Sequence, residues 1–144
     1  MNIPHPPVGY LINRISRLSQ RWLDVRLKQF GITGATVPVL AILKSGEALT
    51  QKELAEQIGT EQPTMAQLLN RMERDGLITR MANPGDGRSS HVLLTERAVR
   101  SLPGARKVME GGQALVTASF STRELATLTR LLERYLASVE THLK

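Results

Sequence analysis

The sequence predicts a mainly α-helical protein with one small β-hairpin. Apolar residues recur in steps of three and four along most of the 144 residues, which indicates amphipathic helices. Only residues 77–94 show β-prone runs around a loop rich in Gly and Pro. The length fits a single domain. We expect residues 8–30 and 96–144 to form dimerisation helices around a central lobe, residues 33–94.

The central lobe is organised around the stretch from Thr50 to Leu94. Thr50 and Glu53 have the spacing of a capping box, which satisfies free backbone donors at a helix start. Leu54 and Ile58 then face inward, and Gly59 follows as a residue that tolerates the left-handed conformation. A short first helix is therefore predicted to end at Gly59.

A second helix is predicted to begin near Glu61 and to bury a stripe that runs from Met65 to Met72. Its opposite face is polar and carries Gln62, Pro63, Thr64, Gln67, Asn70 and Arg71. Amide, hydroxyl and guanidinium side chains suit a helix that lies in the major groove of DNA. An ordinary solvated face is the alternative, and the helix alone does not decide between them.

Two β-prone runs, residues 77–81 and 91–94, bracket the loop of residues 83–90. We expect this loop to interrupt both strands and to project as the tip of a hairpin. At the tip, Arg88 is predicted to reach a phosphate or a narrow minor groove, with Ser89 beside it, and Asp86 to hold the loop in shape through hydrogen bonds. A solvated turn with an incidental arginine is the alternative. Two short helices followed by a hairpin predict a winged helix-turn-helix.

These motifs resemble the MarR family of bacterial transcription regulators, and the start of the second helix resembles its SlyA-like branch. The resemblance rests on residues 53–55, 58–59, 61–64, 69–80 and 83–89. It implies a winged-helix homodimer that binds a palindromic operator, often as a repressor released by a small aromatic or anionic ligand. It also implies a recognition role for Gln62, Pro63, Thr64 and Gln67, and a wing role for Asp86 and Arg88.

Apolar strips are predicted at both ends of the chain. The strip near the N-terminus contains Leu11, Ile15 and Leu18, and the strip near the C-terminus contains Leu125, Leu128, Leu132, Tyr135 and Val139. We expect them to form a homodimer interface, because a two-fold axis doubles the DNA site that one winged helix reads. Packing of the two strips within one chain is the alternative. Residues 1–7 contain three prolines and are predicted to form an extended arm.

A helix is predicted from Glu96 toward Ala118, capped by Thr95. Pro103-Gly104 and a later Gly-Gly pair weaken it, so we expect a kinked helix, with a true break at Pro103 as the alternative.

The formal net charge of +6 favours a polyanionic partner such as double-stranded DNA. The charge is unevenly distributed. Residues 50–97 hold six basic and seven acidic side chains, whereas residues 1–30 hold five basic side chains and one acidic one. Overall charge therefore supplies attraction but does not mark the reading surface.

Tyr10, Arg17 and Trp22 combine rings with a cation and are candidates for binding an aromatic anion, although core or interface packing is the favoured explanation of both rings. The chain has no cysteine, and its three histidines lack paired ligand spacing, so no metal or cofactor is expected. There is no apolar run long enough to cross a membrane, and a cytoplasmic location is predicted.

The leading hypothesis is a dimeric DNA-binding transcription regulator, acting as a repressor. The alternatives are a transcription activator and a helical interaction module that does not bind DNA. No nucleophile beside a base and no paired carboxylates stand out, so an enzyme is not expected.

Overall fold

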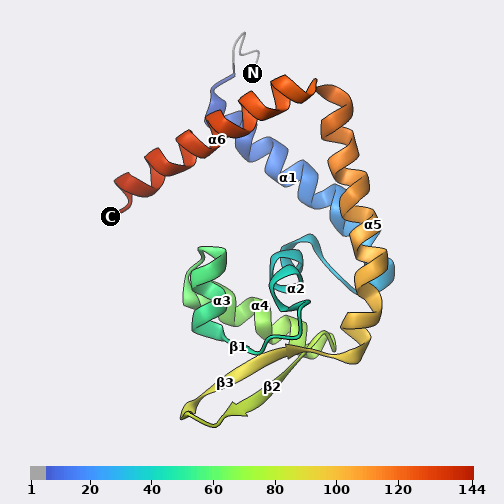
Figure 1. Ribbon diagram of the computed structural model, residues 1–144, viewed down its shortest axis with the longest axis vertical. Helices are drawn as coiled ribbons and strands as arrows, with labels where there is room; N and C mark the ends of the chain where they lie inside the picture. The colour runs from blue at the N-terminus through green and yellow to red at the C-terminus, as the bar shows by residue number, and fades with distance from the viewer. Residues whose placement is uncertain (1–5) are drawn as a thin grey trace. The chain divides into compact units, whose positions relative to one another are not determined.

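The computed structural model describes residues 6–144, apart from the side chain of Asp86. The arm predicted for residues 1–7 lies almost wholly outside the described residues. The helices are α1 (Val8–Leu27), α2 (Val37–Leu43), α3 (Gln51–Ile58), α4 (Gln62–Arg74), α5 (Glu96–Ser119) and α6 (Thr122–His142), and the strands are β1 (Leu49–Thr50), β2 (Ile78–Asn83) and β3 (Asp86–Leu94) (Figure 1). Short 3-10 turns, Lys28–Phe30 and Gly34–Thr36, separate α1 from α2. The predicted fold class is confirmed.

Contacts divide the chain into two compact units, residues 1–108 and 109–144, and the boundary falls inside α5. The first unit holds the helix-turn-helix and the sheet, with one apolar core whose largest fully buried side chains include Leu27, Leu54, Met65, Leu69 and Met72. The boundaries expected for the dimerisation helices stay a prediction.

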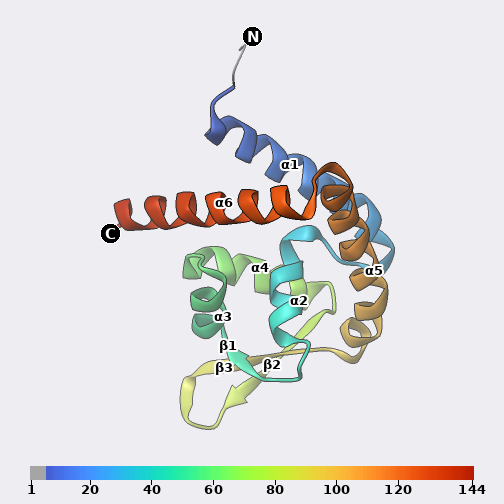
Figure 2. The ribbon, with the colours of Figure 1, turned by 45° about the horizontal axis from the view of Figure 1, so that its top comes forward.

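The two helices α3 and α4 begin and end as their sequences predict (Figure 2). The hydroxyl of Thr50 accepts a hydrogen bond of 3.1 Å from the backbone N–H of Glu53, which satisfies a free donor at the start of α3. Gly59 ends α3 in the left-handed region at φ +79°. Pro63 lies in the first turn of α4, where its missing N–H costs no intrahelical bond.

The three strands form an antiparallel sheet in the order β1-β3-β2. The prediction that residues 83–90 form a loop is wrong, because β2 extends to Asn83 and β3 begins at Asp86, which leaves Pro84 and Gly85 as the turn. Gly87 has no positive φ and continues the strand as any extended residue does. The ladder is irregular here: Ala82 pairs with Ser90 and Asn83 with Asp86, so β3 contains a bulge.

Helix α5 continues through Pro103, so the alternative of a break at this residue does not hold. A proline removes one backbone donor, and the rest of the hydrogen-bond ladder holds the helix together. Gly104 is needed in this turn, since a Cβ atom there would overlap the ring of Phe30. Thr95 caps α5, as predicted, by accepting a hydrogen bond of 3.1 Å from the N–H of Ala98.

The second unit contains the end of α5 and all of α6. Ser121 and Glu124 form the predicted capping box: the backbone N–H of Ser121 donates to Oε1 of Glu124 at 3.0 Å, and the N–H of Glu124 donates to the Ser121 hydroxyl at 3.1 Å. The backbone N–H of Ser121 foremost, and then the Ser121 side chain, stabilise the ionised carboxylate and hold the pKa of Glu124 below its ordinary value. No residue of α6 is buried.

Candidate nucleic-acid interface

The polar face of α4 is open to solvent. Met65, Leu69 and Met72 are fully buried beneath the helix, which fixes its rotation about its own axis. The residues exposed on it include all six predicted recognition residues: Gln62, Pro63, Thr64, Gln67, Asn70 and Arg71. The structure therefore leaves a complete amide-rich helix face free to approach a ligand.

Asn70 differs from the other five, because its side chain is engaged within the lobe. Its Oδ1 accepts a hydrogen bond of 2.8 Å from Nη2 of Arg80 on β2. Nε of Arg80 lies 3.9 Å from Oε1 of Glu73, one turn further along α4. Arg80 was not among the predicted site residues. Its position two residues after the buried Ile78 is the signal that was available, since alternate residues of a strand share a face.

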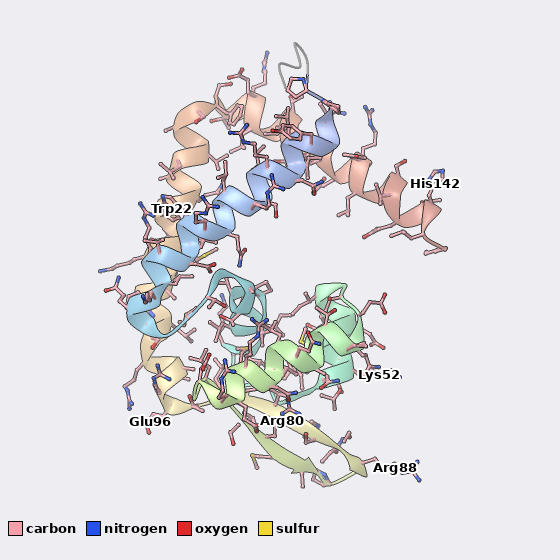
Figure 3. The ribbon with its side chains drawn as sticks, turned by 180° about the vertical axis from the view of Figure 1, so that it is seen from behind. Trp22, Lys52, Arg80, Arg88, Glu96 and His142 are labelled. Atoms are coloured by element: carbon pink, nitrogen blue, oxygen red, sulfur yellow. The ribbon has the colours of Figure 1, made fainter. Side chains whose placement is uncertain are left out.

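A groove of about 450 Å³ lies between the start of α3, the start of α4 and the wing. Its lining residues come from five elements, β1, α3, α4, β2 and β3: Thr50, Gln51, Lys52, Gln62, Arg80, Asn83, Arg88, Ser89, Ser90 and Val92. Three of the predicted site residues meet here, namely Gln62, Arg88 and Ser89. The other predicted recognition residues, Pro63, Thr64, Gln67, Asn70 and Arg71, are not part of its lining. Figure 3 labels Lys52 on α3, Arg80 on β2 and Arg88 at the wing tip.

The tip of the wing is shaped by Asn83. Its Oδ1 accepts a hydrogen bond of 3.0 Å from the N–H of Gly85, and its Nδ2 donates to the hydroxyl of Ser89 at 3.0 Å. An asparagine that bonds the backbone two residues on is a common way to build a turn. The shaping role predicted for Asp86 lies outside the described side chains.

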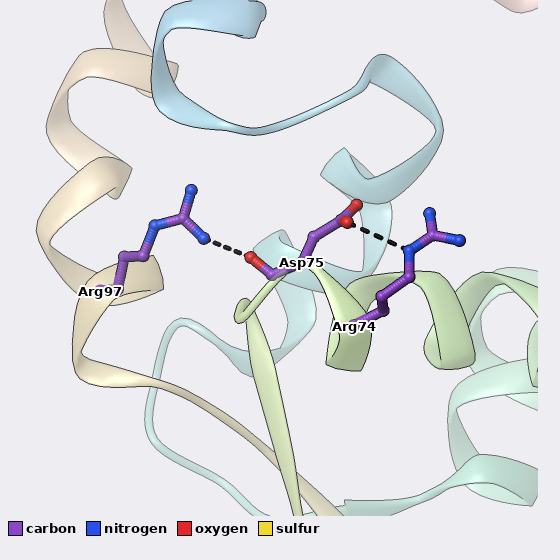
Figure 4. A network of polar contacts seen from close by, with 3 residues as sticks. All are labelled: Arg74, Asp75 and Arg97. Atoms are coloured by element: carbon purple, nitrogen blue, oxygen red, sulfur yellow. Dashed lines mark hydrogen bonds and ion pairs between the residues drawn. The ribbon is translucent and has the colours of Figure 1, made fainter.

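The far end of α4 is tied to α5. The guanidinium of Arg97 donates to the backbone carbonyl of Asp75, whose side chain pairs with Arg74 at 3.4 Å (Figure 4). A cation beside the last carbonyls of a helix is favoured by the helix dipole. The hydroxyl of Thr95 also donates to the carbonyl of Gly76 at 2.6 Å. Both contacts tie the end of α4 to the start of α5.

The candidate ligand residues on α1 have separate surroundings. Arg17 lines an open hollow of about 700 Å³ with Ser16, Gln20, Arg21, Asp24 and Ala35. Tyr10 is 46% exposed, and its hydroxyl accepts a long contact of 3.5 Å from Arg14. The ring of Trp22 is covered by the guanidinium of Arg26, 3.9 Å from its centroid. Neither ring is part of the hollow's lining, so the structure does not gather the three residues into one site.

Apolar side chains remain exposed on both helices that were predicted to dimerise. On α1, Leu11, Ile15 and Leu18 are 41%, 61% and 49% exposed. On α6, Leu132, Tyr135 and Val139 are 41–44% exposed, and Leu125 and Leu128 are half-buried. Within the part of the chain that the structure describes, no group of three potential metal ligands occurs, and no helix is long and apolar enough to cross a membrane.

Two helices in tandem, a third supporting helix and a hairpin beside the second define a winged helix-turn-helix protein. Residues 30–89 match the family model of the MarR family. The same fold spans nearly all of the chain in solved structures. The S. aureus MepR–DNA complex is 25% identical, with a TM-score of 0.86 over 93% of this chain and 99% of that chain.

A mutant MarR from E. coli complexed with operator DNA is 26% identical, with a TM-score of 0.81 over 90% of this chain and 94% of that chain. A MarR transcriptional regulator from Methanosarcina mazei Go1, 22% identical, shares the fold at a TM-score of 0.79 over 93% of this chain and 96% of that chain. The winged-helix fold extends over nearly all of the chain, and residues 30–89 match the MarR family. The resemblance to its SlyA-like branch stays a prediction.

Proposed function

We propose that this protein is a DNA-binding transcription regulator. The observation that carries the proposal is the exposed face of α4, which presents Gln62, Thr64 and Gln67 beside a wing that carries Arg88. Glutamine amides pair with adenine edges and a threonine methyl contacts the thymine methyl, so this face suits direct reading in a major groove. Two solved relatives in complex with DNA add support.

We propose that the protein acts as a homodimer on a palindromic operator. The exposed leucines, isoleucine and valine of α1 and α6 need a cover, because apolar area left in water costs about 25 cal/mol per Å². A second copy of the chain supplies equivalent surfaces, and a two-fold axis presents two copies of α4 to two half-sites one or more helical turns apart.

We further propose that the regulator is a repressor released by a small aromatic or anionic ligand. The hollow beside Arg17 and Arg21 offers two cations to such an anion. A ligand shifts the regulator away from DNA only if it binds the non-operator state more tightly. Activation is the alternative sign of regulation. It depends on where the operator lies relative to a promoter, and a reporter gene under that operator distinguishes the two.

The proposal is tested by sequencing the genomic DNA fragments that the purified protein enriches, alongside Gln67→Ala and Gln113→Ala. Gln113 is an exposed glutamine on α5 and serves as the matched control. We expect the wild type and Gln113→Ala to enrich the same palindrome and Gln67→Ala to lose preference at one base pair in each half-site. A wild type that enriches no sequence at low salt would favour the interaction module that does not bind DNA.

A further inference from the structure

Half of the basic side chains in residues 50–97 line one groove. Residues 50–97 carry a net charge of −1, which gives no general attraction for DNA. The groove between α3, α4 and the wing is nevertheless lined by three cations, Lys52, Arg80 and Arg88, and no carboxylate is among the described side chains that line it. Hydroxyls of Thr50, Ser89 and Ser90 line the same groove. Cations and hydroxyl donors around one opening are the groups that contact phosphate oxygens.

Arg80 is held rigidly within this groove. Its side chain is only 28% exposed, Asn70 accepts its Nη2–H at 2.8 Å, and Glu73 lies 3.9 Å from its Nε. Asn70 and Glu73 both belong to α4, so the guanidinium of Arg80 is fixed relative to the recognition helix and not only to its own strand. A side chain that is already ordered loses little further entropy when it binds.

The guanidinium of Arg80 retains donors that no described residue satisfies. Guanidinium has five N–H donors and no acceptor. Asn70 is the one acceptor of a hydrogen bond from Arg80 among the described residues, and Nε is buried beside Glu73, where no ligand reaches it. The side chain as a whole is partly exposed and lines the groove, so the remaining Nη donors are open to an anionic acceptor. A planar fork of donors matches the two free oxygens of a phosphodiester.

We propose that this groove seats a phosphate of the DNA backbone and that Arg80, with Lys52 and Arg88, binds it. Asn70 and Glu73 are positioning residues that hold Arg80 in place. Asn70 therefore acts through Arg80, and it does not read a base as its exposed position on α4 alone suggests. The inference rests on the proposed function and deepens it, because it separates the residues that supply affinity from those that supply sequence preference.

The proposal is tested by measuring the affinity of each variant for the operator selected by the wild type, at several salt concentrations. Arg80→Met is expected to weaken binding about ten- to hundredfold, because a charged hydrogen bond is lost. It should also reduce the slope of log affinity against log salt by about 1, since one phosphate contact disappears. Base preferences should stay unchanged at every position. Arg80→Lys should keep the slope but not the full affinity, because the cation remains and the fork does not.

Two further variants identify the role of Asn70 and the extent of the groove. Asn70→Ala should weaken binding without relaxing any base preference, and it should have no further effect when Arg80 is already methionine, because the two residues act as a unit. Lys52→Met, at an exposed position on α3, should also lower the salt slope by about 1. It tests the same groove without disturbing the packing beneath α4.

Arg100→Met is the matched control for charge. Arg100 is 67% exposed on α5, where it pairs with Glu96 at 3.1 Å, and its removal should leave the slope unchanged. The proposal is wrong if the wild type binds with a steep slope and both Arg80→Met and Lys52→Met keep it. It is also wrong if Asn70→Ala relaxes preference at one base pair. A wild type that binds no DNA would instead refute the proposed function, and with it the proposal that the groove binds a backbone phosphate.

Discussion

Two glycines that end helices test whether Arg97 stabilises the junction between α1, α4 and α5. Gly31 and Gly59 both adopt the left-handed region, at φ +68° and +79°. A Cβ atom at Gly59 would meet no described atom within 4 Å, whereas one at Gly31 would overlap the guanidinium of Arg97. The two positions therefore share the backbone penalty and differ in the side chain that must move.

The expected costs follow from these surroundings. An alanine in the left-handed conformation costs about 1–2 kcal/mol, and this is the whole expected cost of Gly59→Ala. Gly31→Ala must also displace Arg97 from the carbonyl of Asp75. Hydrogen bonds to charged groups contribute about 1.5–3 kcal/mol, and the exposure of Arg97 places this one at the low end or below. Gly31→Ala should therefore lower the free energy of unfolding by about 1 kcal/mol more than Gly59→Ala does.

The assay is urea unfolding followed by circular dichroism, at one fixed protein concentration because the proposed dimerisation would make stability depend on it. The extra cost of Gly31→Ala should vanish when Arg97 is replaced by methionine, since the displaced contact is then already absent. Equal costs for the two glycine variants in the wild-type background, or an extra cost that survives Arg97→Met, would refute the reasoning.

Three further predictions concern α5 and α6. Gly104→Ala should destabilise the protein by about 1–2 kcal/mol, because overpacking against Phe30 outweighs the gain in helix propensity, and urea unfolding should show this loss reduced when Phe30 is leucine. The lowered pKa of Glu124 means that its stabilising bonds with Ser121 are present above the ordinary pKa of glutamate and lost as pH falls through the lower folded value. A circular dichroism titration of Glu124→Gln, which keeps an acceptor but cannot be protonated in this range, should therefore show less loss of stability on acidification than the wild type. Leu132→Asp should convert the dimer to a monomer in sedimentation velocity, and an unchanged sedimentation coefficient would contradict the proposed interface.

The helix-turn-helix was predictable because its signals are local. A cap such as Thr50, a terminating glycine such as Gly59 and a buried stripe such as Met65 to Met72 each lie within one or two helical turns. The position of the wing in the sequence was predicted correctly, but its strands are longer and its turn shorter than predicted. Glycine and aspartate predict turns on average, yet Gly87 takes an ordinary strand conformation because pairing with β2 supplies the hydrogen bonds of the ladder.

The part of the candidate site that sequence patterns missed depends on tertiary contacts. Arg80 and Asn70 are ten residues apart on a strand and a helix, and no helical or strand period links them. Sequence patterns indicated only that Gly104 weakens α5. The reason for a glycine at this position is the ring of Phe30, which lies far away in the sequence and leaves no room for a Cβ atom. Local patterns therefore predict which faces are exposed. They do not predict which exposed side chain is engaged by a neighbour.

The uneven charge of the lobe also favours one orientation on DNA in the proposed complex. Residues 50–97 include seven carboxylates, and none is among the described side chains that line the groove. Carboxylates on other faces, such as those of Glu53 and Glu56, repel the phosphate backbone when the lobe approaches wrongly. The cations of the groove attract it only when α4 and the wing face the duplex. A lobe with a net charge of −1 thus has low non-specific affinity for DNA. The interaction energy of the correct orientation therefore differs more from that of the incorrect orientations.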